Sequence, residues 1–215
     1  MWRMVPRVAA PTHPLPPRPA RCCQKTCPHM PIRVDFLPEM SHGLPGRVGL
    51  TFAPGKRDGY RWARDLGTDL DRLRLHYGTD VLVSLMEDAE YEFLQIANLV
   101  PEATARGIRV RRFSIVDGHA PPPDELDAFV GLVREIERAA ESGEVVVIHC
   151  RGGLGRAGTV AAAFLVMRGH PPDDAIATVR ATRSPSAVET RAQEAWIARV
   201  ASEVRTDRDA AGTRL

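Results

Sequence analysis

The sequence predicts one α/β domain with a central, mostly parallel sheet flanked by helices. Three observations lead to this prediction. Short apolar segments alternate with segments whose apolar residues recur at helical spacing, as in a sheet covered by helices. Two of the short segments, residues 81–85 and 145–148, are continuously apolar, which is typical of parallel strands buried on both faces. The 215 residues suit a single domain with additional segments, since domains commonly hold about 100–200 residues.

The first half of the domain begins with a strand. Apolar residues alternate over residues 48–52, and a proline–glycine turn closes the segment. Leucines at helical spacing predict a helix over residues 66–73, and the apolar run at 81–85 predicts the next strand. A helical stretch near residues 91–100 and a strand around residues 108–115 follow.

The second half contains the longest periodic patterns. Apolar residues at helical spacing predict an amphipathic helix over residues 126–136, directly behind three prolines. The most apolar strand then leads into a glycine-rich turn and an apolar helix over residues 159–167. Two more helices are expected, over residues 173–182 with Asp173 as the N-cap and over residues 190–204.

Both ends of the chain are predicted to be disordered. Residues 1–30 form a basic tail with seven of the 18 prolines and no acidic residue, a composition that cannot bury an apolar face. Alternatively, this tail lies upstream of the true start, with Met30 or Met40 as the first residue. The folded domain is expected over residues 31–205, and the polar residues 206–215 are expected to fray.

The charge distribution argues against a nucleic-acid partner. The formal net charge is +2, but residues 1–30 carry five basic side chains, so the rest of the chain is slightly acidic. No run of about 18 apolar residues is present to span a membrane. Cys22, Cys23 and Cys27 lack a second ligand pair at zinc-finger spacing, so we expect no metal and no cofactor. The protein is expected to be a cytoplasmic monomer.

The most informative segment is the loop that follows the strand at 145–148. It separates Cys150 from Arg156 by five residues, which are Arg151, Gly152, Gly153, Leu154 and Gly155. Glycines let consecutive backbone N–H groups converge, and such a nest beside a helix N-terminus binds a phosphate dianion. The positive electrostatic field of these N–H groups also stabilises a thiolate. The guanidinium of Arg156 can offer two parallel donors to phosphate oxygens. Cys150 is therefore a candidate nucleophile for phosphoryl transfer; the alternative is a buried core cysteine beside a glycine turn.

A leaving alkoxide or phenoxide also needs a proton. Asp117 follows a predicted strand, and the carboxyl ends of parallel strands share one edge of a sheet, so Asp117 and Cys150 can converge there. A carboxyl group at that position suits a general acid. The alternative for Asp117 is a turn-forming Asp-Gly pair. Asp88 and Asp124 are the other candidate acids, although they look more like a solvated residue or a helix cap.

The pattern His149-Cys150-x5-Arg156 resembles the active-site motif of cysteine-dependent protein phosphatases of the tyrosine and dual-specificity type. It is most similar to the kinase-associated phosphatase (cyclin-dependent kinase inhibitor) branch. Residues 49–55, 116–118, 179–183 and 187–190, with Gln193, carry further parts of the resemblance, which runs from about residue 33 to residue 204. It implies a dual-specificity-phosphatase-like fold.

The resemblance also implies roles for individual residues in a two-step reaction without metal. Cys150 would form a phosphocysteine while Asp117 protonates the leaving oxygen, and Asp117 would then act as base for the hydrolysing water. Arg156 and the loop residues 151–155 would hold the phosphate oxygens. His149 would orient the loop through hydrogen bonds, and Gln193 would position water or simply be solvated.

One position departs from the family pattern. The residue after the arginine is normally Ser or Thr, whose hydroxyl helps the phosphoenzyme to break down, but here it is Ala157. Thr159 lies two residues further on, about 200° around the helix, and should not replace the missing donor. Slow turnover is therefore an open alternative.

The preferred substrate is a phosphorylated protein, with phosphotyrosine, phosphoserine or phosphothreonine as the monoester. Only Arg151 adds charge among the variable loop residues, whereas highly phosphorylated lipids or inositols would call for several cations. The alternatives are a small-molecule or inositol-phosphate phosphatase, and a phospho-binding pseudophosphatase supported by Ala157. A sulfur-transfer or arsenate-reducing enzyme fits less well, because it would not need Asp117 and a reductase would need a second cysteine in the folded part.

Overall fold

The computed structural model describes residues 30–59 and 62–212. Five strands form one mixed sheet in the order β1-β2-β5-β3-β4. The pairs β2–β5, β5–β3 and β3–β4 are parallel, and only β1 runs antiparallel to its neighbour β2. The strands are β1 (Asp35–Phe36), β2 (Arg47–Phe52), β3 (Val81–Ser84), β4 (Arg109–Arg112) and β5 (Val145–Cys150). The predicted α/β domain with a mostly parallel sheet is confirmed.

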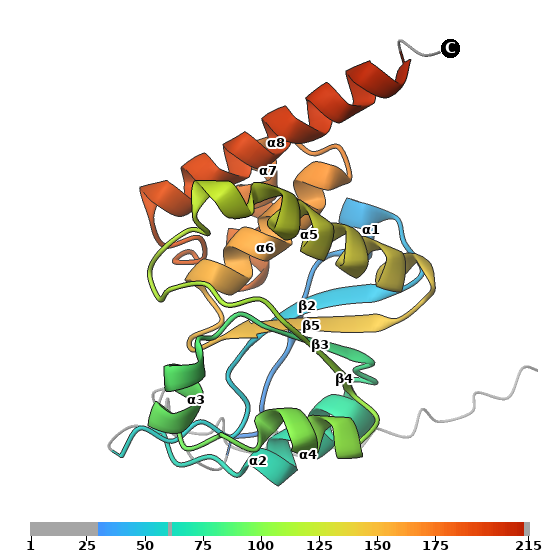
Figure 1. The fold of residues 1–215 in the computed structure, drawn as a ribbon. Helices are drawn as coiled ribbons and strands as arrows, with labels where there is room; N and C mark the ends of the chain where they lie inside the picture. Colours follow the sequence, from blue (N-terminus) through green and yellow to red (C-terminus); the bar gives the residue numbers. More distant parts are fainter. Residues whose placement is uncertain (1–29, 60–61, 213–215) are drawn as a thin grey trace, which may run out of the picture.

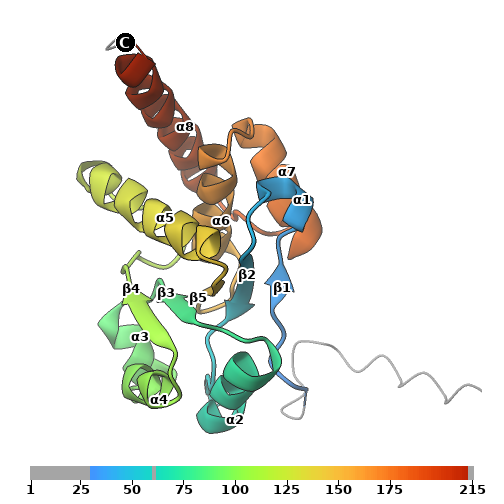
Figure 2. The same cartoon turned by 90° about the vertical axis from the view of Figure 1, so that its right-hand side faces the viewer.

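Helices cover both faces of this sheet, as Figures 1 and 2 show. On one face lie α1 (Glu39–His42), α5 (Leu126–Glu141), α6 (Gly155–Met167), α7 (Pro172–Thr182) and α8 (Arg191–Gly212). On the other face lie α2 (Leu66–Asp71), which continues as a π-helix (Arg72–His76), α3 (Asp88–Phe93) and α4 (Leu99–Ala105). A 3-10 turn (Pro123–Glu125) precedes α5.

The central strand β5 explains why its sequence is apolar without alternation. Val146 and Ile148 belong to the core on the side of α5–α8, whereas Val147 belongs to the core under α2–α4. All three side chains are completely buried. A strand covered by helices on both faces must be apolar at every position, as the continuous run predicted.

Helix α6 packs directly on the sheet and is surrounded by its neighbours. It contacts α5, α7, α8, β2 and β5, and every one of its residues is buried. A helix with apolar residues on all sides is stable only at such a position. The residue that begins it, Gly155, is itself buried.

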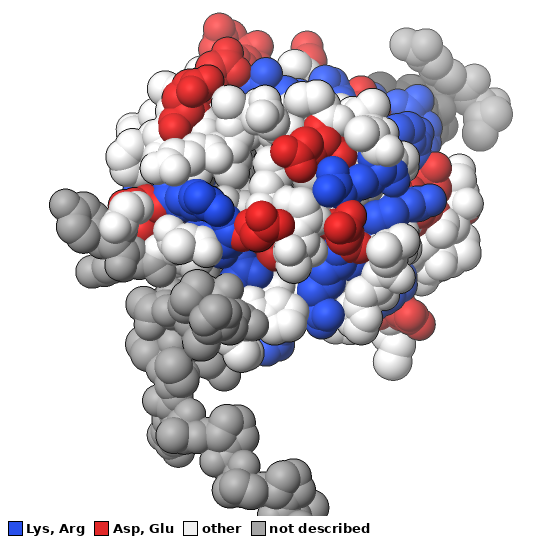
Figure 3. Space-filling model, turned by 90° about the horizontal axis from the view of Figure 1, so that it is seen from below, with Lys and Arg blue, Asp and Glu red and all other residues white. Residues whose placement is uncertain are grey.

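Charged side chains of both signs lie next to one another on the face seen in Figure 3. One ion pair of the molecule joins Asp71 at the end of α2 to Arg106 at the end of α4, with 2.7 Å between the oxygen and the nitrogen. Among the residues that the structure describes, no helix is long and apolar enough to cross a bilayer.

Several predicted boundaries need correction. The helical stretch near residues 91–100 is two helices, α3 and α4, because Gln95 adopts a left-handed conformation with φ 56° between them. Helix α6 starts at Gly155 rather than at residue 159, since the loop after Cys150 leads straight into it. The N-cap of α7 is Pro171, and Asp173 instead lies in the first turn, where a negative charge suits the helix dipole.

The ends of the domain differ from expectation in three places. Strand β1 and helix α1 are too short to leave a periodic pattern and were not predicted. Strand β4 covers only part of residues 108–115. Helix α8 continues to Gly212, whereas we expected the chain to fray from Thr206. The predicted disordered tail at residues 1–30 lies outside the described residues except for Met30, and so do its cysteines.

Candidate active site

The strand ends and the loops that follow them form one rim of the sheet. Parallel register places Phe52 at the end of β2 beside Cys150 at the end of β5, and Ser84 at the end of β3 beside His149. A pocket of about 540 Å³ opens at this rim. Its lining residues come from segments far apart in the sequence: Lys56, Asp58, Trp62, Leu94, Asp117, Gly118, Cys150, Arg151, Gly152 and Glu189.

The loop after β5 curls around the sulfur of Cys150. The side chain is nearly buried, and its Sγ accepts a hydrogen bond from the backbone N–H of Gly153 at 3.2 Å. Gly153 has φ 70°, and a Cβ atom there would lie 2.2 Å from the backbone oxygen of Thr51. Only glycine can make this approach, so the loop depends on the glycine that the sequence provides.

Cationic side chains hold the carbonyl oxygens of this loop. Arg183 donates from Nε to the oxygen of Gly153 at 3.0 Å and from Nη2 to that of Gly152 at 3.3 Å. Lys56 donates to the oxygen of Arg151 at 3.1 Å. Because the C=O and N–H of a trans peptide point in opposite directions, the loop N–H groups point away from these cations. This orientation supports the predicted anion-binding nest.

Arg156 is the most constrained side chain in the site. Its guanidinium is 1% exposed and donates to both oxygens of Glu90, at 2.6 Å from Nη1 and 2.8 Å from Nη2. Nη1 also donates to the backbone oxygens of Leu85 and Ile115, at 3.2 and 2.9 Å. Burial opposes the charge, but the hydrogen bonds that Arg156 donates to Glu90, together with the nearby anions, raise the pKa of Arg156 above its ordinary value. The guanidinium is therefore a permanent, fixed cation.

One donor of Arg156 has no partner in the part of the chain that the structure describes. Its Nε is buried and makes no hydrogen bond with any described residue. A buried, unpaired N–H on a cation is costly unless a ligand supplies an acceptor. A phosphate oxygen beside Cys150 would be such an acceptor.

Glu90 is a site residue that the sequence analysis missed. It lies on α3, where it also accepts a hydrogen bond from the backbone N–H of Glu87 as part of a capping box. Burial works against its charge, but the hydrogen bonds from Arg156 and Glu87 lower the pKa of this carboxyl group. The signal in the sequence was an acidic first helical turn after a buried strand, which is too common to single out one residue.

Asp117 reaches the pocket from the loop after β4. Its Oδ1 forms an ion pair with Nη2 of Arg156 at 2.8 Å, and its Oδ2 lies 3.8 Å from Nη1 of Arg151. The following Gly118 has φ 76°, a left-handed conformation that lets the chain reverse direction directly after Asp117. Of the three candidate acids, only Asp117 lines the pocket, since Asp88 pairs with Arg112 on the surface and Asp124 lies in the 3-10 turn.

The surroundings of His149 and Gln193 differ from those that we expected from the resemblance. Neither ring nitrogen of His149 makes a hydrogen bond of good geometry with a described residue. Complete burial lowers the pKa of His149 to about 4, which keeps the ring neutral at pH 7. Gln193 is buried rather than solvated. Its Oε1 accepts from the N–H of Glu189 at 2.8 Å and its Nε2 donates to the oxygen of His119 at 3.1 Å, so both ends of the amide are engaged with the backbone.

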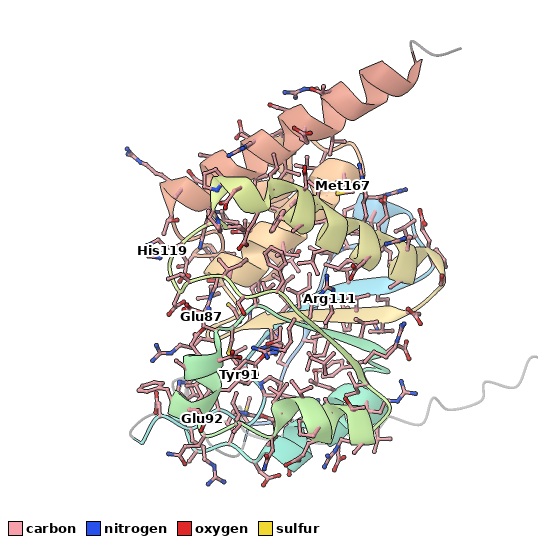
Figure 4. The ribbon with its side chains drawn as sticks, in the orientation of Figure 1. Glu87, Tyr91, Glu92, Arg111, His119 and Met167 are labelled. Atoms are coloured by element: carbon pink, nitrogen blue, oxygen red, sulfur yellow. The ribbon has the colours of Figure 1, made fainter. Side chains whose placement is uncertain are left out.

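Figure 4 shows His119 on the loop that joins the Asp117 turn to α5, above Glu87 and Tyr91 of the α3 region. The hydrogen bond to His119 therefore ties the acid loop to the beginning of α8, which holds Gln193. The hydroxyl of Thr159 donates to the backbone oxygen of Gly155 at 2.9 Å. The donor of this hydroxyl is thus engaged within α6; that Thr159 does not replace the missing hydroxyl at Ala157 stays a prediction.

Lys56 is the second residue that the sequence analysis missed. Its side chain is 6% exposed, and its Nζ lies 3.8 Å from the ring centroid of Trp62 and 4.7 Å from that of Phe52. Burial lowers the pKa of Lys56 to about 8, although the charge of Cys150 acts in the opposite direction. The signal was compositional: Lys25 and Lys56 are the only two lysines among the 29 basic residues. In a chain whose other basic residues are arginines, a lysine indicates a position that requires a compact ammonium group.

Sequence comparisons relate this chain to known phosphatases. Residues 63–170 match a family model described as "Polymorphic toxin system, DSP-PTPase phosphatase". Cyclin-dependent kinase inhibitor 3 from Sus scrofa is 29% identical over 163 residues, which cover 74% of each chain. Protein tyrosine phosphatase type IVA 2 from Mus musculus is 32% identical over 107 residues, or 50% of this chain and 59% of that one.

Solved structures share the fold. The kinase associated phosphatase, crystallised with its catalytic site cysteine substituted by serine, superposes with a TM-score of 0.75 at 23% identity, covering 82% of this chain and 98% of that one. Tk-PTP in its active form is 32% identical with a TM-score of 0.59, covering 73% of this chain and 92% of that one. The predicted resemblance to the tyrosine and dual-specificity type is confirmed.

Proposed function

Because the chain belongs to the family of dual-specificity and tyrosine phosphatases, which are hydrolases, we propose that it hydrolyses phosphate monoesters of proteins through a phosphocysteine on Cys150. The observation that carries this proposal is the buried, unpaired Nε of Arg156 beside the Cys150 loop. The guanidinium of Arg156 and the loop around Cys150 together provide an anion site with a sulfur nucleophile at its base.

Substrate binding changes the contacts of Arg156. A phosphate oxygen that accepts from Nε and Nη2 competes with the ion pair between Arg156 and Asp117, which measures 2.8 Å in this structure. Glu90 keeps the guanidinium in place from the other side through its two hydrogen bonds. The substrate thus releases the carboxyl group that the first step needs, while the phosphate-binding geometry is retained.

In the first step, the thiolate of Cys150 attacks phosphorus and the bond to the ester oxygen breaks. The electron pair passes to the leaving oxygen, and Asp117 supplies its proton. Lys56 lies near enough for mutual attraction with the charge of Cys150, so its ammonium favours the attacking thiolate. In the second step, water attacks phosphorus and the thiolate leaves, and Asp117 is unprotonated and can accept the proton of the water.

A phosphoprotein is the substrate class that the pocket walls favour. Lys56 and Arg151 line the pocket, but Asp58, Asp117 and Glu189 line it as well. A highly phosphorylated inositol or lipid headgroup would bring its extra phosphates against these carboxylates, whereas a protein monoester brings one phosphate. Action in the cytoplasm as a monomer remains part of the proposal.

A substrate panel tests the proposal. Wild type and Cys150→Ser are compared on p-nitrophenyl phosphate, on phosphotyrosine and phosphothreonine peptides, and on phosphoinositide vesicles. We expect wild type to release phosphate from the aryl ester and from at least one peptide, and Cys150→Ser to be inactive on all of them. Preference for the vesicles would support the inositol-phosphate alternative, and phosphate-ester binding without any release would support the pseudophosphatase alternative.

A further inference from the structure

Two exposed apolar side chains lie beside the catalytic pocket. Phe93 at the end of α3 is 59% exposed, and Val116, directly before Asp117, is 51% exposed. Single apolar residues on a protein surface are ordinary, but two from different elements at the edge of one pocket call for an explanation. Neither belongs to the two core clusters of the described residues, so the hydrophobic core does not account for them.

Arg151 locates the ring of Phe93 at the edge of this pocket. The guanidinium carbon of Arg151 lies 5.0 Å from the centroid of the Phe93 ring, and Arg151 lines the pocket directly after Cys150. Leu94, the residue after Phe93, lines the pocket as well. Phe93 remains more than half exposed with Arg151 over it, so ring surface next to the pocket is free to bind a ligand.

Val116 is held at the same edge by the acid loop. The backbone oxygen of Ile115 accepts from Nη1 of Arg156 at 2.9 Å, and Asp117 pairs with Nη2 of Arg156 at 2.8 Å. The residues on both sides of Val116 are therefore anchored to one arginine. Asp117 also lies 3.8 Å from Arg151, the same side chain that covers the aromatic ring at the end of α3.

The charges around the pocket favour an uncharged residue next to the phosphoresidue of a substrate. Asp58, Asp117 and Glu189 line the pocket together with Lys56 and Arg151. Because the phosphate engages the cationic donors, a neighbouring acidic residue would meet carboxylates without compensation. A basic side chain could pair with these carboxylates but would leave the apolar surface in water. An apolar side chain removes that surface from water, which is favourable.

We propose that Phe93 and Val116, together with the aliphatic part of Arg151, form a rim subsite that binds a large apolar side chain of the substrate protein next to its phosphorylated residue. An extended peptide advances about 3.3 Å per residue, so a side chain one or two positions from the phosphoresidue reaches the edge of the pocket. Ligand sites combine a few polar groups with apolar walls in this way. The assignment rests on the proposed function and adds to it which phosphoproteins are preferred.

A set of phosphopeptides with one variable position tests the rim subsite. The peptides share a neutral parent sequence and the phosphoresidue that wild type hydrolyses best, and Leu, Ser, Glu or Lys is placed one or two positions before or after it. We expect kcat/KM for leucine to exceed that for serine by about tenfold at one or more positions, since burial of an apolar side chain favours the complex. Phe93→Ser and Val116→Ser should each reduce this ratio by about threefold or more. Each kcat/KM is divided by the value of the same variant for p-nitrophenyl phosphate, which has no neighbouring residue.

Leu75→Ser is the matched control. Leu75 is 82% exposed, but it lies in the π-helix Arg72–His76 and does not line the pocket. We expect this variant to keep the wild-type preference for leucine. All three substitutions replace an exposed side chain, so the domain should fold in each variant.

Three results would overturn the assignment. Equal kcat/KM for leucine and serine at every position would show that no apolar side chain is bound, and a preference for glutamate or lysine would show that charge selects the neighbouring residue. A leucine preference that persists in both Phe93→Ser and Val116→Ser would locate the subsite elsewhere. In each of these cases wild type still hydrolyses phosphopeptides, and the proposed function stands. If wild type releases phosphate from none of the peptides, the proposed function fails and this assignment fails with it.

Discussion

At Ala157 the site lacks a hydroxyl next to its phosphate-binding arginine. The residue is completely buried in the first turn of α6, and we predict that Thr159 does not act in its place because its hydroxyl is bonded to Gly155. Serine is one oxygen larger than alanine, so the position offers a conservative test of what that hydroxyl contributes.

Ala157→Ser should increase kcat, because a donor to the leaving thiolate speeds the second step. One hydrogen bond to a charged group is worth about 1.5–3 kcal/mol, which sets an upper range of about 10–100-fold. Rapid mixing of wild type with p-nitrophenyl phosphate should show a burst of nitrophenol followed by slower turnover, and the serine variant should show a smaller burst. If wild type shows no burst and the variant has the same kcat, the loop stabilises its thiolate in another way.

Single residues were predictable where sequence spacing alone defines the chemistry. Cys150 and Arg156 lie on either side of one short loop, so their spacing already predicted an anion site. Glu90 reaches the same site from α3 and Lys56 from the segment after β2, and only the tertiary fold brings them there. The side-chain amide of Gln193 forms hydrogen bonds with the backbone of His119 and Glu189, and residue spacing could not predict these contacts.

Among the elements, the loop over residues 115–119 determines where the acid lies. The backbone oxygen of Ile115 accepts from Arg156, and that of His119 accepts from Gln193. Asp117 is thus held between two points that are both attached to the phosphate-binding region. A loop fixed in this way holds its carboxyl group in an orientation suited to the leaving oxygen, so little conformational entropy is lost when the substrate binds.

Asp117→Asn should lower kcat for phosphopeptides by about 10²–10⁴-fold, the usual scale for loss of a general acid. The effect on p-nitrophenyl phosphate should be much smaller, because nitrophenolate leaves without a proton. Asp124→Asn and Asp88→Asn are the controls, since neither residue lines the pocket. Unchanged phosphopeptide turnover in Asp117→Asn would assign the acid elsewhere.

Elements were predicted best where burial is extreme. The apolar patterns of strands β3 and β5 and of helix α5 each fit only one type of secondary structure. The break between α3 and α4 was missed because the left-handed Gln95 is polar and carries no glycine or proline signal. Local propensity cannot indicate a turn that tertiary packing imposes.

For the whole molecule, parallel pairing explains why distant segments meet. Glu90 follows β3, Asp117 follows β4 and Cys150 ends β5, and these three strands run in the same direction. Their carboxyl ends therefore share one edge, where the pocket opens. The rule that ligands bind at this edge of an α/β sheet made the convergence of Asp117 and Cys150 predictable. The position of Glu189 in the pocket lining was not, because it depends on how the segment before α8 folds back over the loop after Cys150.

The central claim is that phosphate is transferred to Cys150, and a direct measurement is to locate it. Wild type is quenched during turnover of p-nitrophenyl phosphate, digested, and its peptides analysed by mass spectrometry, with Cys150→Ser as the control. We predict one phosphate on the sulfur of Cys150 in wild type and none in the variant, because a serine hydroxyl is not ionised at neutral pH. Phosphate on His149, or product release without any phosphorylated protein, would contradict the account.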